Sequence, residues 1–100
     1  MQSPSAPRWR SAPSQAIALR KWDGEFVVRN ERTGNSHLLG PLAGRVLGVL
    51  LDAGDALDAA EIAVRLEPAA SPIEADEAQD DVEDVLAEFR RLGLVESESQ

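Results

Sequence analysis

The spacing of apolar residues changes at Gly40-Pro41, and this change fixes the order of the elements that the chain can form. In residues 16–39 apolar side chains tend to alternate with polar or small ones, which is the two-residue period of a β-strand. In residues 41–93 they recur every three or four residues, which is the period of an amphipathic helix. The sequence therefore predicts strands first and helices afterwards, in an α+β domain.

Two turn signals predict three short strands in the first part of the chain. The dipeptide Asp23-Gly24 lies between two segments of strand character and is typical of a tight hairpin loop. A second strand then covers residues 25–30, a turn covers residues 31–34, and a third strand covers Asn35–Leu39. We expect a three-stranded antiparallel meander, which needs another element packed on one face to be stable.

Capping signals predict three helices in the rest of the chain. Pro41 suits the first turn of a helix, and Gly54 suits the left-handed residue that follows the helix end. Asp58 with Glu61 three residues later resembles the capping box that starts a second helix, and Pro68 ends that helix.

The third helix is expected to be the longest. Ser71-Pro72 signals its start, although a start as late as Glu77 or Asp80 also fits the sequence. Gly93 ends it, and Leu94-Val95 can fold back as the hydrophobic contact beyond the cap. A three-stranded antiparallel meander followed by three helices, the first two short, predicts a winged-helix-like α+β fold.

The length of 100 residues allows one small domain. We expect residues 1–7, which are rich in Ser and Pro, to form a disordered tail. Residues 8–96 then form the domain, and residues 97–100 form a polar tail. Trp9 lies just inside the domain boundary, and we expect its large apolar ring to dock on the domain.

The residue types that most catalytic and metal sites need are missing from the sequence. It contains no Cys and a single His, which excludes thiol nucleophiles, disulfides and Cys-rich or His-rich metal sites. It also holds no glycine-rich phosphate loop and no nucleophile elbow, so we expect neither an enzyme nor a cofactor. His37 lies in the third strand, where a cross-strand contact is the simplest role and contact with a bound peptide is the alternative.

Targeting signals are missing from the sequence as well. No segment approaches the roughly 18 apolar residues that a membrane span needs. No apolar stretch follows the arginines near the N-terminus, as it does in a secretory signal. We therefore expect a cytoplasmic protein with no membrane partner.

Charge is distributed unevenly along the chain. Residues 1–50 hold seven basic and three acidic side chains, whereas residues 51–100 hold three basic and fifteen acidic ones. This pattern indicates either two differently charged faces or an acidic helix that is simply solvated. A winged helix normally reads DNA with its third helix, but residues 74–92 hold eight acidic side chains and two arginines. Such a helix repels phosphates, so we expect no nucleic-acid partner.

Four segments of the chain together resemble the PqqD family. They are Trp22-Asp23-Gly24-Glu25-Phe26-Val27-Val28, Thr33-Gly34-Asn35-Ser36-His37-Leu38-Leu39, Leu42-Ala43 and Leu92-Gly93-Leu94-Val95. The pattern is most similar to the branch called HPr-kinase-related system PqqD-type peptide chaperones, and it covers about residues 8–96. The resemblance implies a RiPP recognition element, a non-catalytic domain that captures the leader segment of a ribosomally made precursor peptide. It also implies that the leader adds as a strand beside the third strand and lies against the third helix.

The sequence is compatible with that binding mode. The third strand can be a sheet edge, because no further strand is expected after it and it contains no Pro. The apolar stripe of the third helix is normally core, but two of its members can instead line the wall of a groove. Asp81, Asp84 and Glu88 share a face of that helix, either as a solvated face or as an acidic rim for a basic leader. The candidate peptide-binding residues are Asn35, Ser36, His37, Leu38, Leu39, Asp81, Val82, Asp84, Val85, Glu88 and Phe89.

The expected partners are a leader peptide and a separate modifying enzyme, for which a kinase-like protein of the same system is one candidate. The main alternative is an assembly subunit that forms a homodimer, or docks on a partner enzyme, through the same strand edge. A winged-helix DNA-binding protein is the less favoured alternative. No catalytic residue and no metal ligand is expected.

Overall fold

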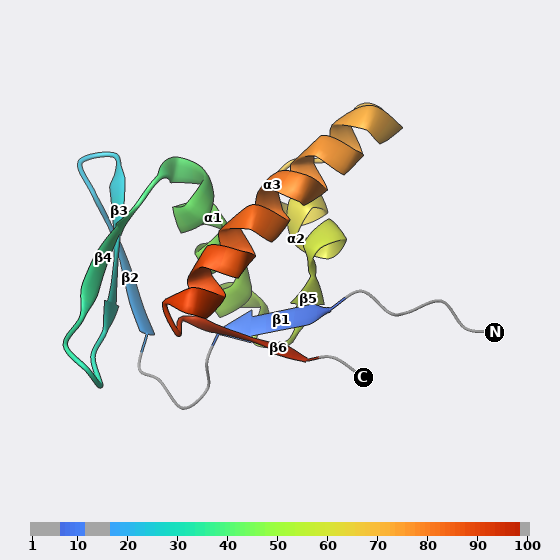
Figure 1. Ribbon diagram of the computed structural model, residues 1–100. Coiled ribbons are helices and arrows are strands. Elements are labelled where there is room, and N and C mark those ends of the chain that lie inside the picture. Colours follow the sequence, from blue (N-terminus) through green and yellow to red (C-terminus); the bar gives the residue numbers. More distant parts are fainter. Residues whose placement is uncertain (1–6, 12–16, 99–100) are drawn as a thin grey trace.

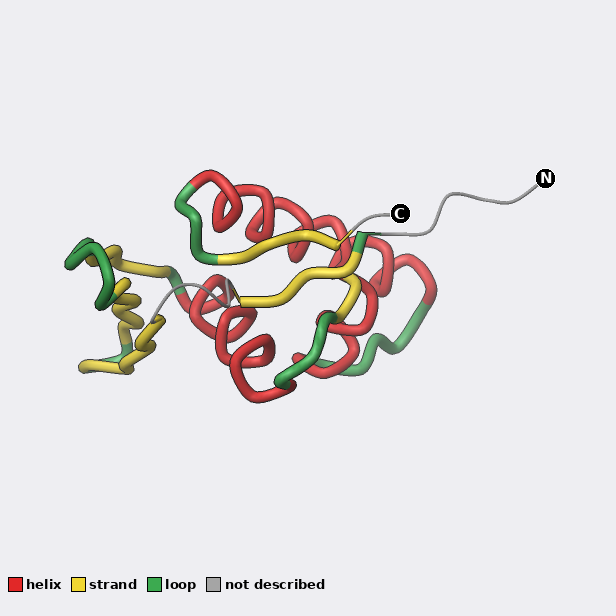
Figure 2. The backbone as a smooth tube through the Cα atoms, turned by 90° about the horizontal axis from the view of Figure 1, so that it is seen from below, coloured by secondary structure: helices red, strands yellow, loops and turns green. Residues whose placement is uncertain are grey.

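The computed structural model describes residues 7–11 and 17–98 of the chain (Figure 1). In chain order the elements are β1 (Arg8–Ser11), β2 (Ile17–Trp22), β3 (Glu25–Asn30), β4 (Ser36–Leu39), α1 (Pro41–Ala53), β5 (Leu57–Asp58), α2 (Ala59–Leu66), α3 (Pro72–Arg91) and β6 (Val95–Glu98). The strands form two sheets, ordered β2-β3-β4 and β5-β1-β6. Figures 1 and 2 show the first sheet at one end of the molecule and the second sheet alongside the helices. None of the described helices combines the length and the apolar character that crossing a bilayer requires.

The predicted antiparallel meander is confirmed. Trp22 pairs with Glu25 across a two-residue loop, in which Asp23 has φ 52° and Gly24 has φ 82°. Positive φ at both loop residues is what a type I′ turn requires, and its twist matches that of the flanking strands. The second turn is held by Asn30, whose N–H donates to Asn35 O at 2.9 Å and whose O accepts from Gly34 N–H at 2.7 Å. The two turns fix the register of all three strands.

The starts of α2 and α3 follow their predicted caps. The Asp58 carboxylate accepts from Glu61 N–H at 2.8 Å, and Glu61 Oε1 accepts from Asp58 N–H at 3.0 Å, which completes a capping box. Ser71 Oγ accepts from Glu74 N–H at 3.2 Å. This cap selects the earliest of the starts that the sequence allowed, so α3 begins at Pro72.

The end of α3 is also as predicted. Gly93 has φ 76°, and Leu94 N–H donates to Phe89 O at 3.0 Å. This pattern closes the helix with a left-handed residue and turns the chain back toward the core. Leu94 and Val95 are buried, so they form the hydrophobic contact beyond the cap.

The second sheet corrects the predicted element order. Residues 97–100 were expected to be a polar tail, but Ser97 pairs with Trp9 and Glu98 pairs with Arg8 in the ladder between β6 and β1. β5 was not predicted either, because a strand of two residues has no alternation to detect. The expected docking of Trp9 is confirmed, since its side chain lies in the hydrophobic core. Residues 1–6 of the expected N-terminal tail lie outside the described residues.

Helix α1 joins the first sheet to the rest of the fold. Its Gly44 faces the ring of Phe26 on β3 so closely that a Cβ at this position would collide with the ring. Val28 on β3 and Val46 on α1 are fully buried in the same core as Leu86 and Phe89 of α3. This packing holds β4 in a fixed relation to α3, and the space between them is the candidate site.

Candidate functional site

Strand β4 has an open edge, as expected for the third strand of the meander. Within the part of the chain that the structure describes, it pairs only with β3 and is the last strand of its sheet. In an antiparallel ladder, bonded and non-bonded residue pairs alternate. Since Asn30 N–H donates to Asn35 O, the alternation directs the N–H and C=O of His37 and Leu39 toward β3. The N–H and C=O of Ser36 and Leu38 then face the open edge.

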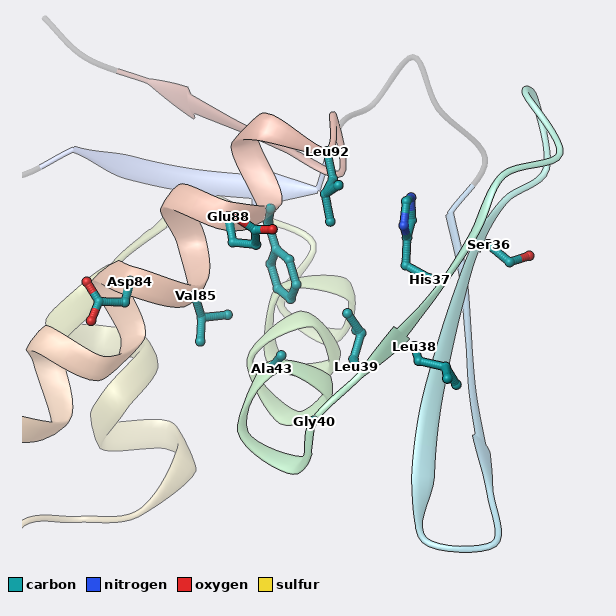
Figure 3. Close-up of a pocket in the computed structure, with 11 residues that line it drawn as sticks. Ser36, His37, Leu38, Leu39, Gly40, Ala43, Asp84, Val85, Glu88 and Leu92 are labelled. Atoms are coloured by element: carbon teal, nitrogen blue, oxygen red, sulfur yellow. The ribbon is translucent and has the colours of Figure 1, made fainter.

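A groove of about 750 Å³ runs between this edge and the C-terminal half of α3 (Figure 3). We call it the β4–α3 groove. It is lined by Ser36, His37, Leu38, Leu39, Gly40, Ala43, Asp84, Val85, Glu88, Phe89 and Leu92. Three elements therefore build it: β4 as one wall, α3 as the other, and the first turn of α1 between them.

The middle of the groove is apolar. Leu39 points from β4 and Val85 from α3 into the space above Ala43, as Figure 3 shows. Phe89 completes this surface and is only 1 % exposed, so most of its ring belongs to the core. Val85 is half-buried and keeps part of its surface open to the groove. This region can bury an apolar side chain of a bound molecule.

One end of the groove is more polar. His37 and Leu92 lie on opposite sides of the gap between β4 and the end of α3 (Figure 3). Glu88 projects from α3 at the same end, and its carboxylate lies 2.9 Å from the guanidinium of Arg91. Both side chains of this ion pair are largely exposed, so the pair contributes little to stability and can exchange partners. Among the described residues that line the groove, Asp84 and Glu88 carry carboxylates and none is Lys or Arg.

The β4–α3 groove brings together eight of the eleven residues predicted from the sequence. They are Ser36, His37, Leu38, Leu39, Asp84, Val85, Glu88 and Phe89. Of the predicted strand residues, Asn35 lies outside the lining, because it belongs to the turn before β4. Asp81 and Val82 line a different pocket, between α2 and the N-terminal half of α3. Asp81 shares a helix face with Glu88 but lies seven residues away, about 10 Å along the axis, beyond the reach of β4.

Three lining residues were not predicted: Gly40, Ala43 and Leu92. Leu92 continues the stripe of Val85 and Phe89 and was detectable from that spacing. Gly40 and Ala43 have no functional group that would mark them as site residues in the sequence. Their place in the groove depends on the direction in which α1 follows β4.

The expected cross-strand role of His37 is confirmed, since it pairs with Val28 of β3. The same side chain lines the groove, so the two roles that the sequence left open are compatible. Within residues 7–11 and 17–98, no group of three or more His, Asp or Glu side chains is placed to hold a metal ion.

Comparisons with known proteins match this architecture. The family model described as "Coenzyme PQQ synthesis protein D (PqqD)" matches residues 25–95, which include every residue of the β4–α3 groove. No curated protein matches the chain.

Two similar solved structures share the fold. One is described as "Lasso peptide synthetase B1 complexed with the leader peptide"; it is 22 % identical, has a TM-score of 0.64, and the match covers 88 % of this chain and 96 % of that one. The other, "TbiB1 in Complex with the TbiA(beta) Leader Peptide", is 20 % identical with a TM-score of 0.67, over 91 % of this chain and 99 % of that one. At this identity the likeness establishes the fold.

Proposed function

Because this chain belongs to the PqqD family, we propose that it is a non-catalytic recognition element for a ribosomally made precursor peptide. It binds the leader segment of the precursor as an added strand on β4. It then presents the rest of the peptide to a separate modifying enzyme. Precursors of this kind are made on ribosomes, so the proposal places the protein in the cytoplasm.

The observation that carries this proposal is the open edge of β4 beside an apolar groove. Ser36 and Leu38 offer backbone N–H and C=O groups that an extended peptide can pair with. Backbone pairing supplies affinity with little demand on sequence, and side-chain pockets beside the edge supply specificity. The groove provides such pockets through Leu39, Val85 and Phe89.

The comparisons support the same function. Both similar structures are described as complexes with a leader peptide, and both cover nearly the whole of this chain. The family model spans β3, β4 and α3, which are the elements that the proposal uses. A kinase-like protein of the same system is the candidate for the enzyme that receives the peptide.

A chemical-shift titration of the isotope-labelled full chain tests the proposal. The ligand is the synthetic leader of the precursor peptide encoded beside this chain, and duplex DNA is the control. We expect amide shifts at residues 36–40 and 84–92 with the peptide and none with DNA. Shifts that map to α2 instead, or an equal response to DNA, would contradict the placement.

Self-association through the same edge is the competing explanation, since a second copy of β4 can also satisfy open backbone groups. Line broadening at β4 that grows with protein concentration, without any response to the peptide, would favour an assembly subunit. Peptide-induced shifts at constant protein concentration would favour the recognition element.

A further inference from the structure

We infer that the β4–α3 groove selects a peptide with an apolar side chain and a Lys or Arg two residues away from it. The inference rests on the proposed function, because it specifies the side chains of the same peptide. It adds a chemical pattern that can be tested without knowing the natural leader.

The spacing follows from the geometry of strand addition. Side chains alternate between the two faces of a sheet, and neighbouring strands share this alternation. His37 and Leu39 point to the α3 side of β4, because their ladder partners Val28 and Phe26 face the core. A strand added to β4 therefore directs two side chains into the groove, one beside Leu39 and one beside His37. These positions are two residues apart whichever way the peptide runs.

The position beside Leu39 is apolar. Ala43, Val85 and Phe89 surround it, and none of them offers a polar side-chain atom. A charged side chain placed there would lose its hydration without gaining a partner. An aliphatic or aromatic side chain would instead bury its surface against these residues.

The position beside His37 is acidic. Glu88 and Leu92 lie across the groove from His37, whereas Asp84 lies one helical turn farther from it, beside Val85 (Figure 3). The stem of a Lys or Arg can pack on Leu92 while its charged group reaches the Glu88 carboxylate. Arg91 competes for the same carboxylate from outside the groove lining, but a carboxylate has room for two charged donors.

The remaining peptide positions should tolerate any residue. Their side chains share the face of Ser36 and Leu38, and the Leu38 side chain is 73 % exposed. Figure 3 shows Leu38 pointing away from α3. The groove should therefore select side chains only at alternate positions of the peptide. General attraction between a basic peptide and an acidic protein would instead favour basic residues at every position.

The test uses a phage-displayed library of short random peptides, sorted on the immobilised full chain. Enriched peptides are synthesised, and their dissociation constants are measured by fluorescence anisotropy. We expect the enriched peptides to share an apolar residue and a basic residue two positions apart, with no preference at the position between them.

Charge reversal at Glu88 supplies the decisive comparison. Glu88→Lys should weaken the binding of the basic peptides by about tenfold. When the library is sorted again on this variant, acidic residues should be enriched at the same peptide position. Glu83→Lys is the matched control: it makes the same change in net charge at an exposed position of α3 that does not line the groove, and it should leave both results nearly unchanged. Circular dichroism establishes that both variants are folded.

The possible results distinguish a failure of this inference from a failure of the proposed function. Peptides that bind at β4 with no basic preference, or that lose equal affinity in both variants, would overturn the inference and leave the recognition element intact. If no extended peptide is enriched on the chain, both the inference and the proposed function are wrong.

Discussion

At the scale of single residues, the most consequential feature is the contact between Gly44 and Phe26. Gly44 lies in the first half of α1, and the ring of Phe26 occupies the space where a Cβ would be. The missing side chain lets β3 approach α1 closely, and β4 is held by β3. This close packing of α1 on β3 therefore supports β4, which forms one wall of the β4–α3 groove.

Substitution of Gly44 by Ala tests how much this close contact contributes to stability. The added methyl group must displace the Phe26 ring, and such overpacking costs about 1–3 kcal/mol. Gly48→Ala on the same helix is the matched control, because its Cβ would meet only Leu19 Cδ2 at 3.8 Å. That change should be neutral or stabilising by up to about 1 kcal/mol, since Ala favours helices over Gly. Urea denaturation measures the free energy of unfolding of both variants. Equal values would show that the close contact between Gly44 and Phe26 does not contribute to stability.

At the scale of elements, β4 has one edge that pairs with β3 and one open edge, on which we propose that a peptide binds. The N–H groups of His37 and Leu39 face β3, whereas those of Ser36 and Leu38 face the groove, as the alternation from the Asn30–Asn35 bond requires. One strand can therefore complete the sheet and receive a peptide at the same time. The Leu38 side chain is 73 % exposed and points away from α3 (Figure 3).

A proline at position 38 should affect backbone hydrogen bonding at the open edge of β4 but not at the edge that pairs with β3. Leu38→Pro removes an N–H that faces the groove and leaves the ladder with β3 in place, so we expect a loss of stability below about 1.5 kcal/mol. Peptide binding should fall at least tenfold, because an added strand loses a backbone donor and meets the proline ring. His37→Pro is the control, since it removes a donor that faces β3 and should destabilise the fold more strongly. Unchanged peptide affinity in a folded Leu38→Pro variant would exclude strand addition at this edge.

The elements also show what the sequence could predict. The hairpin at Asp23-Gly24, the capping box at Asp58 and the end of α3 depend on residues a few positions apart, and all three were predicted. β1, β5 and β6 depend on partners far along the chain, such as Trp9 with Ser97, and their own segments are too short to show a period. The same contrast holds for the groove. Its β4 residues, Val85 and Phe89 were among the predicted site residues, whereas Asp81 and Val82 line a different pocket. A shared helix face does not show where along the helix the facing strand ends.

At the scale of the whole molecule, the N-terminal strand closes the fold. β1 lies between β5 and β6, so it joins β5, which directly precedes α2, to β6, which follows α3. Its Trp9 is part of the core that also contains Leu86 and Phe89 of α3. The family model begins at residue 25, so this strand lies outside the matched region and still supports the helix that forms one wall of the groove.

Removal of the Trp9 side chain should therefore destabilise the entire domain. Trp9→Ala creates a large cavity, and we expect a loss of about 3–5 kcal/mol, a major part of the stability of a small domain. Trp22→Ala is the control within the same chain: Trp22 is 78 % exposed, and its loss should change stability by less than about 0.5 kcal/mol. Thermal and urea unfolding followed by circular dichroism compare the two. Similar stabilities would mean that β1 is not an integral part of the fold.

Amide hydrogen exchange can show whether a leader peptide becomes a fourth strand on β4, as we propose. Exchange at Ser36 and Leu38 is measured in the full chain with and without a saturating leader peptide. We predict that these two amides exchange freely without the peptide and become strongly protected with it, whereas His37 and Leu39 are protected in both states by their bonds to β3. Binding of the peptide without new protection at Ser36 and Leu38 would contradict strand addition on β4 and would place the peptide elsewhere on the molecule.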